Sequence, residues 1–231
     1  MGRAFAVSDI HGNWNVWQKI KAFLQPDDTL YILGDCADRG ERGWDIIKEA
    51  INHPQTIYLK GNHEDMLAKA IKQSQEEDWN CYALQLLRIN GGDSTYQSWQ
   101  ADGAWVEWAT ELNKLPTTTI YKNTQGQTIL LSHAGYTPFY LLYQPEESKL
   151  LWDRDHFFDE WPEDLYLANT YIVHGHTPIL HLANELNIDK EDYAEPFWYC
   201  DNHKCCIDNW TIMSNSAILL DLDTFEFFII E

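Results

Sequence analysis

Three times within the first 75 residues, a short apolar run is followed by a polar loop and then by a segment with helical periodicity. The apolar runs cover residues 4–7, 29–33 and 56–59. Unbroken apolar strands that alternate with helices are typical of a parallel sheet covered by helices on its faces. In such a sheet, ligands bind beyond the carboxyl ends of the strands. The alternation therefore predicts an α/β fold in which the three polar loops meet at one site.

The second polar loop, residues 34–40, reads Gly-Asp-Cys-Ala-Asp-Arg-Gly and holds the charged groups of Asp35, Asp38 and Arg39. Glycine at both ends of the loop favours a turn over a helix. Acidic and basic groups that cluster directly after a buried strand indicate a functional site.

Four further loops follow predicted strands and carry side chains of the metal-binding kind. They contain Asp9 with His11, Asn62 with His63, His133, and His174 with His176. Carboxylate, imidazole and amide groups suit Mn, Fe or Zn, and no paired cysteines accompany them, which excludes a structural thiolate zinc site. Singly, each has an ordinary explanation as a helix-start acid, a turn residue or a buried histidine. Together the loops predict one metal site, and on an extended segment Asp9 and His11 would face the same way.

The chain changes character between residues 76 and 115, where tryptophan, glutamine and helix-forming residues are frequent. We expect an inserted helical cap there, with Trp99, Trp105 and Trp108 in its core. Beyond the cap, we expect a strand at 170–173 and two hairpins. The hairpin strands are expected at 117–121 with 127–131, and at 217–222 with 225–230. The acidic stretch 185–195 is expected to be a solvated loop, although it could instead border the site.

Length and charge limit the possible functions. The 231 residues fit one domain over residues 1–231, and the net charge of −20 argues against a nucleic-acid-binding surface. A metal site could still reverse that field locally and attract a small anion. No apolar run approaches the roughly 20 residues of a membrane span, and the start of the chain leaves no room for a signal peptide. Five unevenly placed cysteines suit free thiols, so we expect a cytoplasmic protein.

Five short motifs occur in a fixed order along the chain. They are Asp-x-His-Gly from Asp9, Gly-Asp-x-x-Asp-Arg-Gly from Gly34, Gly-Asn-His-Glu from Gly61, His-Ala-Gly from His133 and Gly-His-Thr-Pro from Gly175. With these motifs the sequence resembles the calcineurin-like metallophosphoesterases. The Asp-Arg-Gly ending of the second motif is typical of their phosphoprotein phosphatase branch, which includes small bacterial and phage Ser/Thr phosphatases.

The resemblance implies a four-layer α-β-β-α sandwich of two central mixed sheets flanked by helices. It also implies two divalent metal ions, with Mn expected and Fe or Zn as alternatives. Asp9 and His11 would hold the first ion, Asp35 would bridge both, and Asn62, His133 and His176 would complete the second. Two such ions can lower the pKa of a bridging water and clamp a phosphate during in-line displacement.

The resemblance also assigns catalytic roles. Arg39 would bind the phosphate oxygens, and a second arginine is expected after the fourth motif, where Arg154 lies. Arg154 could instead pair with Asp153 or Asp155 on the surface. His63 would be the general acid for the leaving oxygen, with Asp38 orienting it.

Two segments near the fifth motif stay open. His174 is left as a buried histidine near the site, because the motif order here is His-Gly-His-Thr. Cys200, His203, Cys205 and Cys206 fit no standard zinc spacing, and residues 206–208 are expected to begin a strand.

The resulting prediction is a metal-dependent phosphomonoesterase of the Ser/Thr protein phosphatase type. Its substrate would be a phosphorylated protein, a phosphopeptide or a small phosphate ester. One alternative is a symmetrical dinucleoside tetraphosphatase, in which cap aromatics such as those between Trp79 and Trp108 could stack on a base. The other is a binding module that kept the fold and lost activity. Since no expected ligand is missing, the sequence favours an enzyme.

Overall fold

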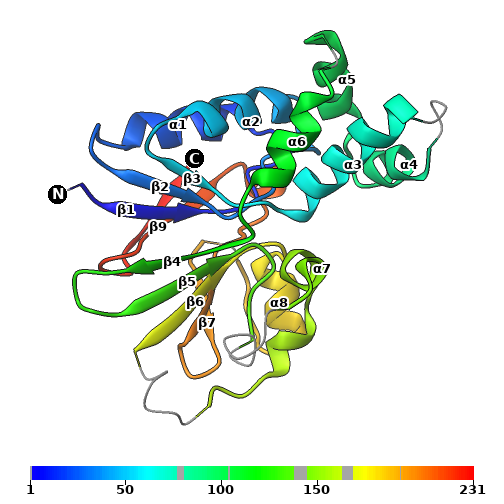
Figure 1. Cartoon of the computed structure of the whole chain (residues 1–231). Coiled ribbons are helices and arrows are strands. Elements are labelled where there is room, and N and C mark those ends of the chain that lie inside the picture. The colour runs from blue at the N-terminus through cyan, green and yellow to red at the C-terminus, as the bar shows by residue number, and fades with distance from the viewer. Residues whose placement is uncertain (1, 77–80, 104, 138–144, 163–168, 193) are drawn as a thin grey trace.

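The computed structural model describes residues 2–76, 81–103, 105–137, 145–162, 169–192 and 194–231 (Figure 1). Its first sheet has the strand order β10-β9-β1-β2-β3. The strands are β1 (Ala4–Val7), β2 (Thr29–Ile32), β3 (Thr56–Tyr58), β9 (Ala217–Asp221) and β10 (Phe227–Ile230). The first three strands are parallel, with Ala4 opposite Thr29 and Leu30 opposite Thr56, whereas β9 and β10 are antiparallel. The alternation predicted for the amino-terminal part is therefore confirmed.

The second sheet has the order β4-β5-β6-β8-β7 and lies below the first in Figure 1. Its strands are β4 (Thr118–Lys122), β5 (Thr128–Ser132), β6 (Thr170–His174), β7 (Phe197–Tyr199) and β8 (Lys204–Cys206). The central strands β5, β6 and β8 are parallel to one another. Of the outer strands, β4 pairs antiparallel with β5, and β7 pairs antiparallel with β8. Both sheets are mixed, as the family resemblance implied.

Helices cover the outer faces of the two sheets. The helices α1 (Trp14–Phe23), α2 (Gly43–Asn52) and α3 (Asn62–Glu76) pack on the first sheet around buried residues such as Trp17 and Ile46. Asn13 caps α1, since its side chain accepts the backbone N–H of Val16 at 3.2 Å. On the second sheet, Leu150 of α7 (Glu147–Trp152) packs with Leu130 and Ile172. The remaining helical segments are a 3₁₀ turn (Asp155–Phe158), α8 (Ile179–Glu185) and α9 (Thr211–Ser214).

The two sheets face each other across a shared apolar layer. Alternate residues of facing strands meet there, among them Ala6, Leu33, Leu131, Val173 and Leu220, and each is fully buried. Burying a Leu or Val side chain stabilises a fold by about 1.5–3 kcal/mol. This layer fixes the first sheet on the second, so that loops from both sheets meet at one edge.

The helices of the expected cap are α4 (Tyr82–Ile89), α5 (Asp93–Ala101) and α6 (Glu107–Lys114). Trp99 is buried, and Trp108 packs edge-on against Trp44 of α2 with ring centroids 4.8 Å apart. Trp105 is 61% exposed, so its predicted place in the cap core is wrong. Its backbone carbonyl, rather than its ring, takes part in packing by accepting the Trp99 Nε1–H at 3.1 Å.

Strand predictions were least accurate in the second sheet. The first hairpin lies one residue later than expected, and the strand expected to begin at Cys206 in fact ends there. Strand β7 was not predicted. Strands β7 and β8 have only three residues each. The first residue of β8 is the fully buried Lys204, so the strand does not show an apolar pattern in the sequence. Its Nζ donates to the carbonyl oxygen of His156 at 2.6 Å.

Two other expectations concern the surface. The described residues that follow α8, 186–192, have neither helix nor strand and are mainly exposed, as expected of a solvated loop. No helix in the described part of the chain is long and apolar enough to cross a membrane.

Candidate metal centre

The predicted metal-binding side chains meet at the carboxyl ends of β1, β2, β3, β5 and β6. Their loops are not extended: Asp9, His11, Asp35 and His176 all have positive φ angles, between 46° and 67°. The expectation that Asp9 and His11 share one side of an extended segment is therefore wrong. Left-handed backbone costs a non-glycine residue about 1–2 kcal/mol. Such strain is concentrated at functional sites and persists only where the surroundings enforce it.

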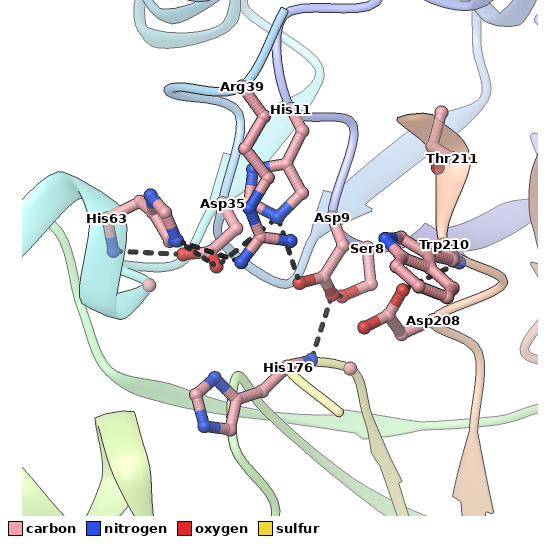
Figure 2. A network of polar contacts seen from close by, with 12 residues as sticks. Ser8, Asp9, His11, Asp35, Arg39, His63, His176, Asp208, Trp210 and Thr211 are labelled. Carbon is pink, nitrogen blue, oxygen red and sulfur yellow. Dashed lines mark hydrogen bonds and ion pairs between the residues drawn. The ribbon is translucent and has the colours of Figure 1, made fainter. Parts of the chain in front are cut away.

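The first group of ligating atoms surrounds His11. Its Nε2 lies 3.8 Å from Asp9 Oδ1 and 3.8 Å from Asp35 Oδ2. His63 approaches the same Asp35 oxygen, with Nε2 also at 3.8 Å. In Figure 2 the carboxylates of Asp9 and Asp35 lie among the imidazoles of these loops. His11, Asp35 and His63 offer atoms within 4.8 Å of one another, as a metal site requires.

The second group shares Asp35 and adds residues from both sheets. His133 Nε2 lies 3.4 Å from Asp35 Oδ1 and 2.8 Å from Asn62 Oδ1. His176 Nδ1 lies 3.0 Å from the same Asn62 oxygen and 3.2 Å from His133 Nε2. Asp35, His133 and His176 also meet the distance criterion for one ion. The structure therefore contains two neighbouring candidate sites with one carboxylate in common.

Three of these histidines have the neutral charge and the unprotonated ring nitrogen that a metal ligand needs. His11 Nδ1 donates to the carbonyl of Ala37 at 2.8 Å, and His133 Nδ1 donates to that of Leu33 at 2.7 Å. Each bond leaves the lone pair on Nε2, directed into the site. Burial lowers the pKa of His11, His133 and His176, so their rings stay neutral, as metal ligands must. Among the described residues, the buried Nε2 atoms of His11 and His176 have no hydrogen-bond partner. This donor set fits divalent ions.

His63 differs from the other histidines although it lies beside them. Its Nδ1 donates to Asp38 Oδ2 at 2.7 Å, and both side chains are buried. Burial alone would lower the pKa of His63, but the charge of Asp35 and the bond to Asp38 outweigh it and raise the pKa. A ring that holds its proton suits an acid better than a ligand. Arg39 Nη2 lies 3.3 Å from His63 Nε2, which puts a cation next to this ring.

Glu64 organises the loops, a role that the sequence did not predict. Its buried carboxylate accepts the backbone N–H groups of Asp35, Cys36, Ala37 and Gly61 at 2.8–3.1 Å. The Gly-Asn-His-Glu motif contains this residue, but nothing in the sequence shows where its side chain goes. One carboxylate thus joins the loop after β2 to the start of α3.

Close approach of the same two loops explains two glycines of the motifs. A Cβ on Gly34, which has φ +92°, would lie 2.6 Å from the Cα of Gly61. A Cβ on Gly61 would lie 2.1 Å from Asp35 Oδ1. Any side chain at either position would separate Asp35 from the loop that carries Asn62 and His63.

A second group that sequence reasoning missed lies behind Asp9. Asp9 Oδ2 accepts the Ser8 hydroxyl and, at 2.9 Å, the backbone N–H of His176. Asp208 is buried beside them, as Figure 2 shows, and its backbone joins the carboxyl end of β8 to α9. Burial and the charge of Asp9 raise the pKa of Asp208. Correct placement of β8 would have shown Asp208 in the position of a strand-end acid.

The second sheet places the remaining predicted residues around the site. Arg154 Nε donates to Thr177 Oγ1 at 2.9 Å, next to His176. Trp152 is 38% exposed, and its ring meets that of His176 edge-on with centroids 6.0 Å apart. His174 is fully buried and bonds through Nε2 to the Tyr199 hydroxyl at 2.8 Å, consistent with the buried histidine expected there.

Three comparisons place this geometry among known proteins. A family model described as calcineurin-like phosphoesterase matches residues 2–204. The chain is 27% identical over 198 residues to serine/threonine-protein phosphatase 2 of Escherichia coli, which covers 80% of this chain and 85% of that protein.

Solved structures with the same fold share little sequence with this chain. A candidate diadenosine tetraphosphatase has a TM-score of 0.63 at 16% identity, covering 99% of this chain and 92% of that one. A protein serine/threonine phosphatase from Saccharomyces cerevisiae has a TM-score of 0.55 at 12% identity, covering 99% of this chain and 78% of that one. At these identities, both matches concern the fold alone.

Proposed function

The chain belongs to the calcineurin-like phosphoesterase family, and we propose that it is a dinuclear, metal-dependent phosphomonoesterase of the Ser/Thr protein phosphatase type. The observation that carries the proposal is the position of Asp35, whose two oxygens lie near His11 Nε2 on one side and His133 Nε2 on the other. The relationship to the E. coli phosphatase supports a phosphorylated protein or peptide, or a small phosphate ester, as the substrate. We assign this activity to one domain over residues 1–231.

Six residues would hold the two ions. We assign Asp9 and His11 to the first ion, Asn62, His133 and His176 to the second, and Asp35 to both. When bound, such ions acidify a water and neutralise the charge of a phosphate. The mixture of carboxylate, amide and imidazole groups supports Mn, with Fe or Zn as alternatives.

The chain's own residues would bind the phosphate and supply the proton. Arg39 extends its guanidinium to 3.3 Å from His63, so the phosphate-binding group and the acid lie side by side. Phosphoryl transfer depends mainly on positioning and charge neutralisation. His63 would give its Nε2 proton to the leaving oxygen, while the bond from Nδ1 to Asp38 fixes the ring.

Arg154 would complete the phosphate-binding set from the second sheet. Its bond to Thr177 directs it along the edge of the site beside His176. This contact supports a role in binding, and a surface pair of the exposed Arg154 with Asp153 or Asp155 stays the alternative. Two guanidinium groups, one from each sheet's loops, could hold different oxygens of one phosphate.

Hydrolysis of phenyl phosphate, an aryl ester whose basic leaving oxygen needs a proton, tests the proposal. With Mn²⁺, we expect turnover that disappears with a chelator and returns when metal is restored. His63→Ala should lower kcat about 100-fold or more with this aryl ester, in the range typical of general-acid removal. A folded, Mn²⁺-loaded protein that is inert toward every phosphate ester tested would refute the proposal.

A second candidate is a symmetrical dinucleoside tetraphosphatase. The similar fold of a candidate diadenosine tetraphosphatase supports it, and so does the exposed ring of Trp152 beside His176, on which a base could stack. Comparing the turnover of a phosphopeptide with that of diadenosine tetraphosphate separates the two. If the second candidate is right, Trp152→Ala should raise KM for the dinucleotide but not for the phosphopeptide.

A further inference from the structure

The turn before the cap helix α5 and the first turn of that helix are bonded to the loop that carries Asp38 and Arg39. Three hydrogen bonds connect them. The carbonyl of Gly91 accepts the Arg39 N–H at 2.9 Å, and the Ser94 hydroxyl donates to the carbonyl of Gly40 at 2.8 Å. The hydroxyl of Thr95 accepts the Asp38 N–H at 2.9 Å. Three consecutive residues of the loop are therefore attached to a segment more than 50 residues further along the chain.

The loop is held in a strained conformation at these attachment points. Asp38 has φ 69° and Arg39 has φ 64°. Without support, each residue would gain about 1–2 kcal/mol by leaving the left-handed region. Because the cap accepts the N–H groups of both residues, it stabilises the left-handed conformation, and a loop that relaxed would lose these hydrogen bonds.

Thr95 is the most restricted of the three cap residues. It is fully buried, and its Oγ1 lies only 2.7 Å from where a Cβ on Gly43, the first residue of α2, would stand. The hydroxyl is thus wedged between α2 and the loop and has little freedom to turn away. Its removal would leave a buried N–H of Asp38 without an acceptor, which costs about 1–3 kcal/mol.

We propose that Thr95 is a positioning residue through which the helical cap fixes the position of Asp38, and so of its partner His63. The inference rests on the phosphatase function proposed above and extends it to the cap. The hydroxyl of Thr95 accepts the backbone N–H of Asp38, so Thr95 would act through that backbone. Loss of its hydroxyl should therefore affect proton transfer more than metal or substrate binding.

The test compares Thr95→Val with Thr95→Ser in the Mn²⁺-loaded protein, using phenyl phosphate, whose basic leaving oxygen needs a proton. Valine keeps the shape and removes the hydroxyl, whereas serine keeps the hydroxyl. We expect Thr95→Val to lower kcat about 10–100-fold, the range for a small misplacement of a catalytic group, with KM and Mn²⁺ affinity within about twofold. Thr95→Ser should restore most of kcat. A Thr95→Val variant with wild-type kcat, or a Thr95→Ser variant as slow as it, would overturn the proposal.

Two control variants separate positioning from general damage to the cap. Thr110→Val makes the same chemical change at an exposed position of α6 and should leave kcat unchanged. Leu112→Ala removes a buried side chain from the same helix and should lower the melting temperature without lowering kcat. If Leu112→Ala slowed turnover as much as Thr95→Val at equal stability, loosening of the cap would explain both, and the specific role of Thr95 would be refuted.

Amide hydrogen exchange gives an answer that does not depend on activity. In Thr95→Val, the Asp38 amide, followed in a peptide covering residues 36–42, should exchange at least about tenfold faster than in wild type, because its N–H loses the Thr95 acceptor. Unchanged exchange would refute the inference. A wild-type protein without phosphatase activity would instead refute the proposed function, so the two failures can be told apart.

Discussion

The two halves of the metal centre are built in different ways. The loops of the first sheet, which carry Asp35 and His63, are joined by the single carboxylate of Glu64 through four backbone N–H groups. The loops of the second sheet are held by separate bonds: His156 Nε2 donates to the carbonyl of Ala134 at 2.7 Å, and Cys206 Sγ donates to that of Thr177 at 3.3 Å. One half is organised by one carboxylate that binds four backbone N–H groups, whereas the other depends on several separate contacts.

A dinuclear site needs a ligand shared by both ions and further ligands for each ion, and the two halves contribute differently to these. The proposed shared ligand Asp35 and the proposed acid His63 both come from the half organised by Glu64. The half with His133 and His176 is brought to it by packing of the two sheets. We therefore expect damage to the first half to affect both ions, and damage to the second half to affect one.

Removal of the shared carboxylate should have the largest effect. Asp35→Asn retains the size of the side chain but removes a charge from both ligand groups. We expect kcat/KM with p-nitrophenyl phosphate to fall on the order of 1000-fold or more, beyond the 10–100-fold typical of partners outside the ligand set. Asp27→Asn, at an exposed position, is the control. Activity of Asp35→Asn within tenfold of wild type would contradict the shared role.

Removal of the Glu64 carboxylate should weaken the fold itself. Glu64→Ala leaves four buried N–H groups without their acceptor, and we expect a loss of at least about 3 kcal/mol in the free energy of unfolding. Urea unfolding of the metal-free protein measures it, and exposed Glu107→Gln is the control. A loss below about 1 kcal/mol would show that water or other groups replace the carboxylate readily.

Acid should weaken the second half through His156. Burial, and then the charge of Lys204, lowers the pKa of His156 to about 3. Between that value and the usual pKa of about 6.5, the unfolded chain binds a proton that the folded one does not. The free energy of unfolding therefore decreases as the pH is lowered, by up to about 1.4 kcal/mol per pH unit. His156→Gln should reduce this slope, whereas His181→Gln, at an exposed position, should not. Equal slopes in wild type and His156→Gln would refute the assignment.

The smallest effect is expected at the cysteine segment of the second half. Cys200 is half-buried and donates to the carbonyl of Asp159 at 3.1 Å. Because we assign no ion to this segment, Cys200→Ser should leave bound Mn²⁺ unchanged and stability within about 0.5 kcal/mol, as for most surface changes. Loss of one bound ion in this variant would reveal a metal site at residues 200–206.

The same two halves differ in how well the sequence predicts them. In the first, each βα unit combines an unbroken apolar strand with a polar loop, so both the strands and the positions of Asp9, Asp35 and Asn62 could be read directly. In the second, the three-residue strands β7 and β8 and the buried Lys204 give no clear periodicity, and Asp208 was missed with them.

Some features of the site could not be read from any local pattern. The roles of Glu64 and Thr95 depend on backbone N–H groups that lie 3 to 57 residues away in the chain. The positive φ angles of Asp9 and His11 are likewise imposed by tertiary contacts, since these residue types do not require them. Pattern reasoning finds the ligands, and only the fold shows what holds them.

Mn²⁺ stoichiometry tests the account most directly. Calorimetric titration of the metal-free protein, checked by elemental analysis after gel filtration, should give two bound ions per chain in wild type. His133→Ala should retain one ion, whereas Asp35→Asn should retain none that survives gel filtration. Fewer than two ions in wild type, or two in Asp35→Asn, would contradict a dinuclear centre built around Asp35.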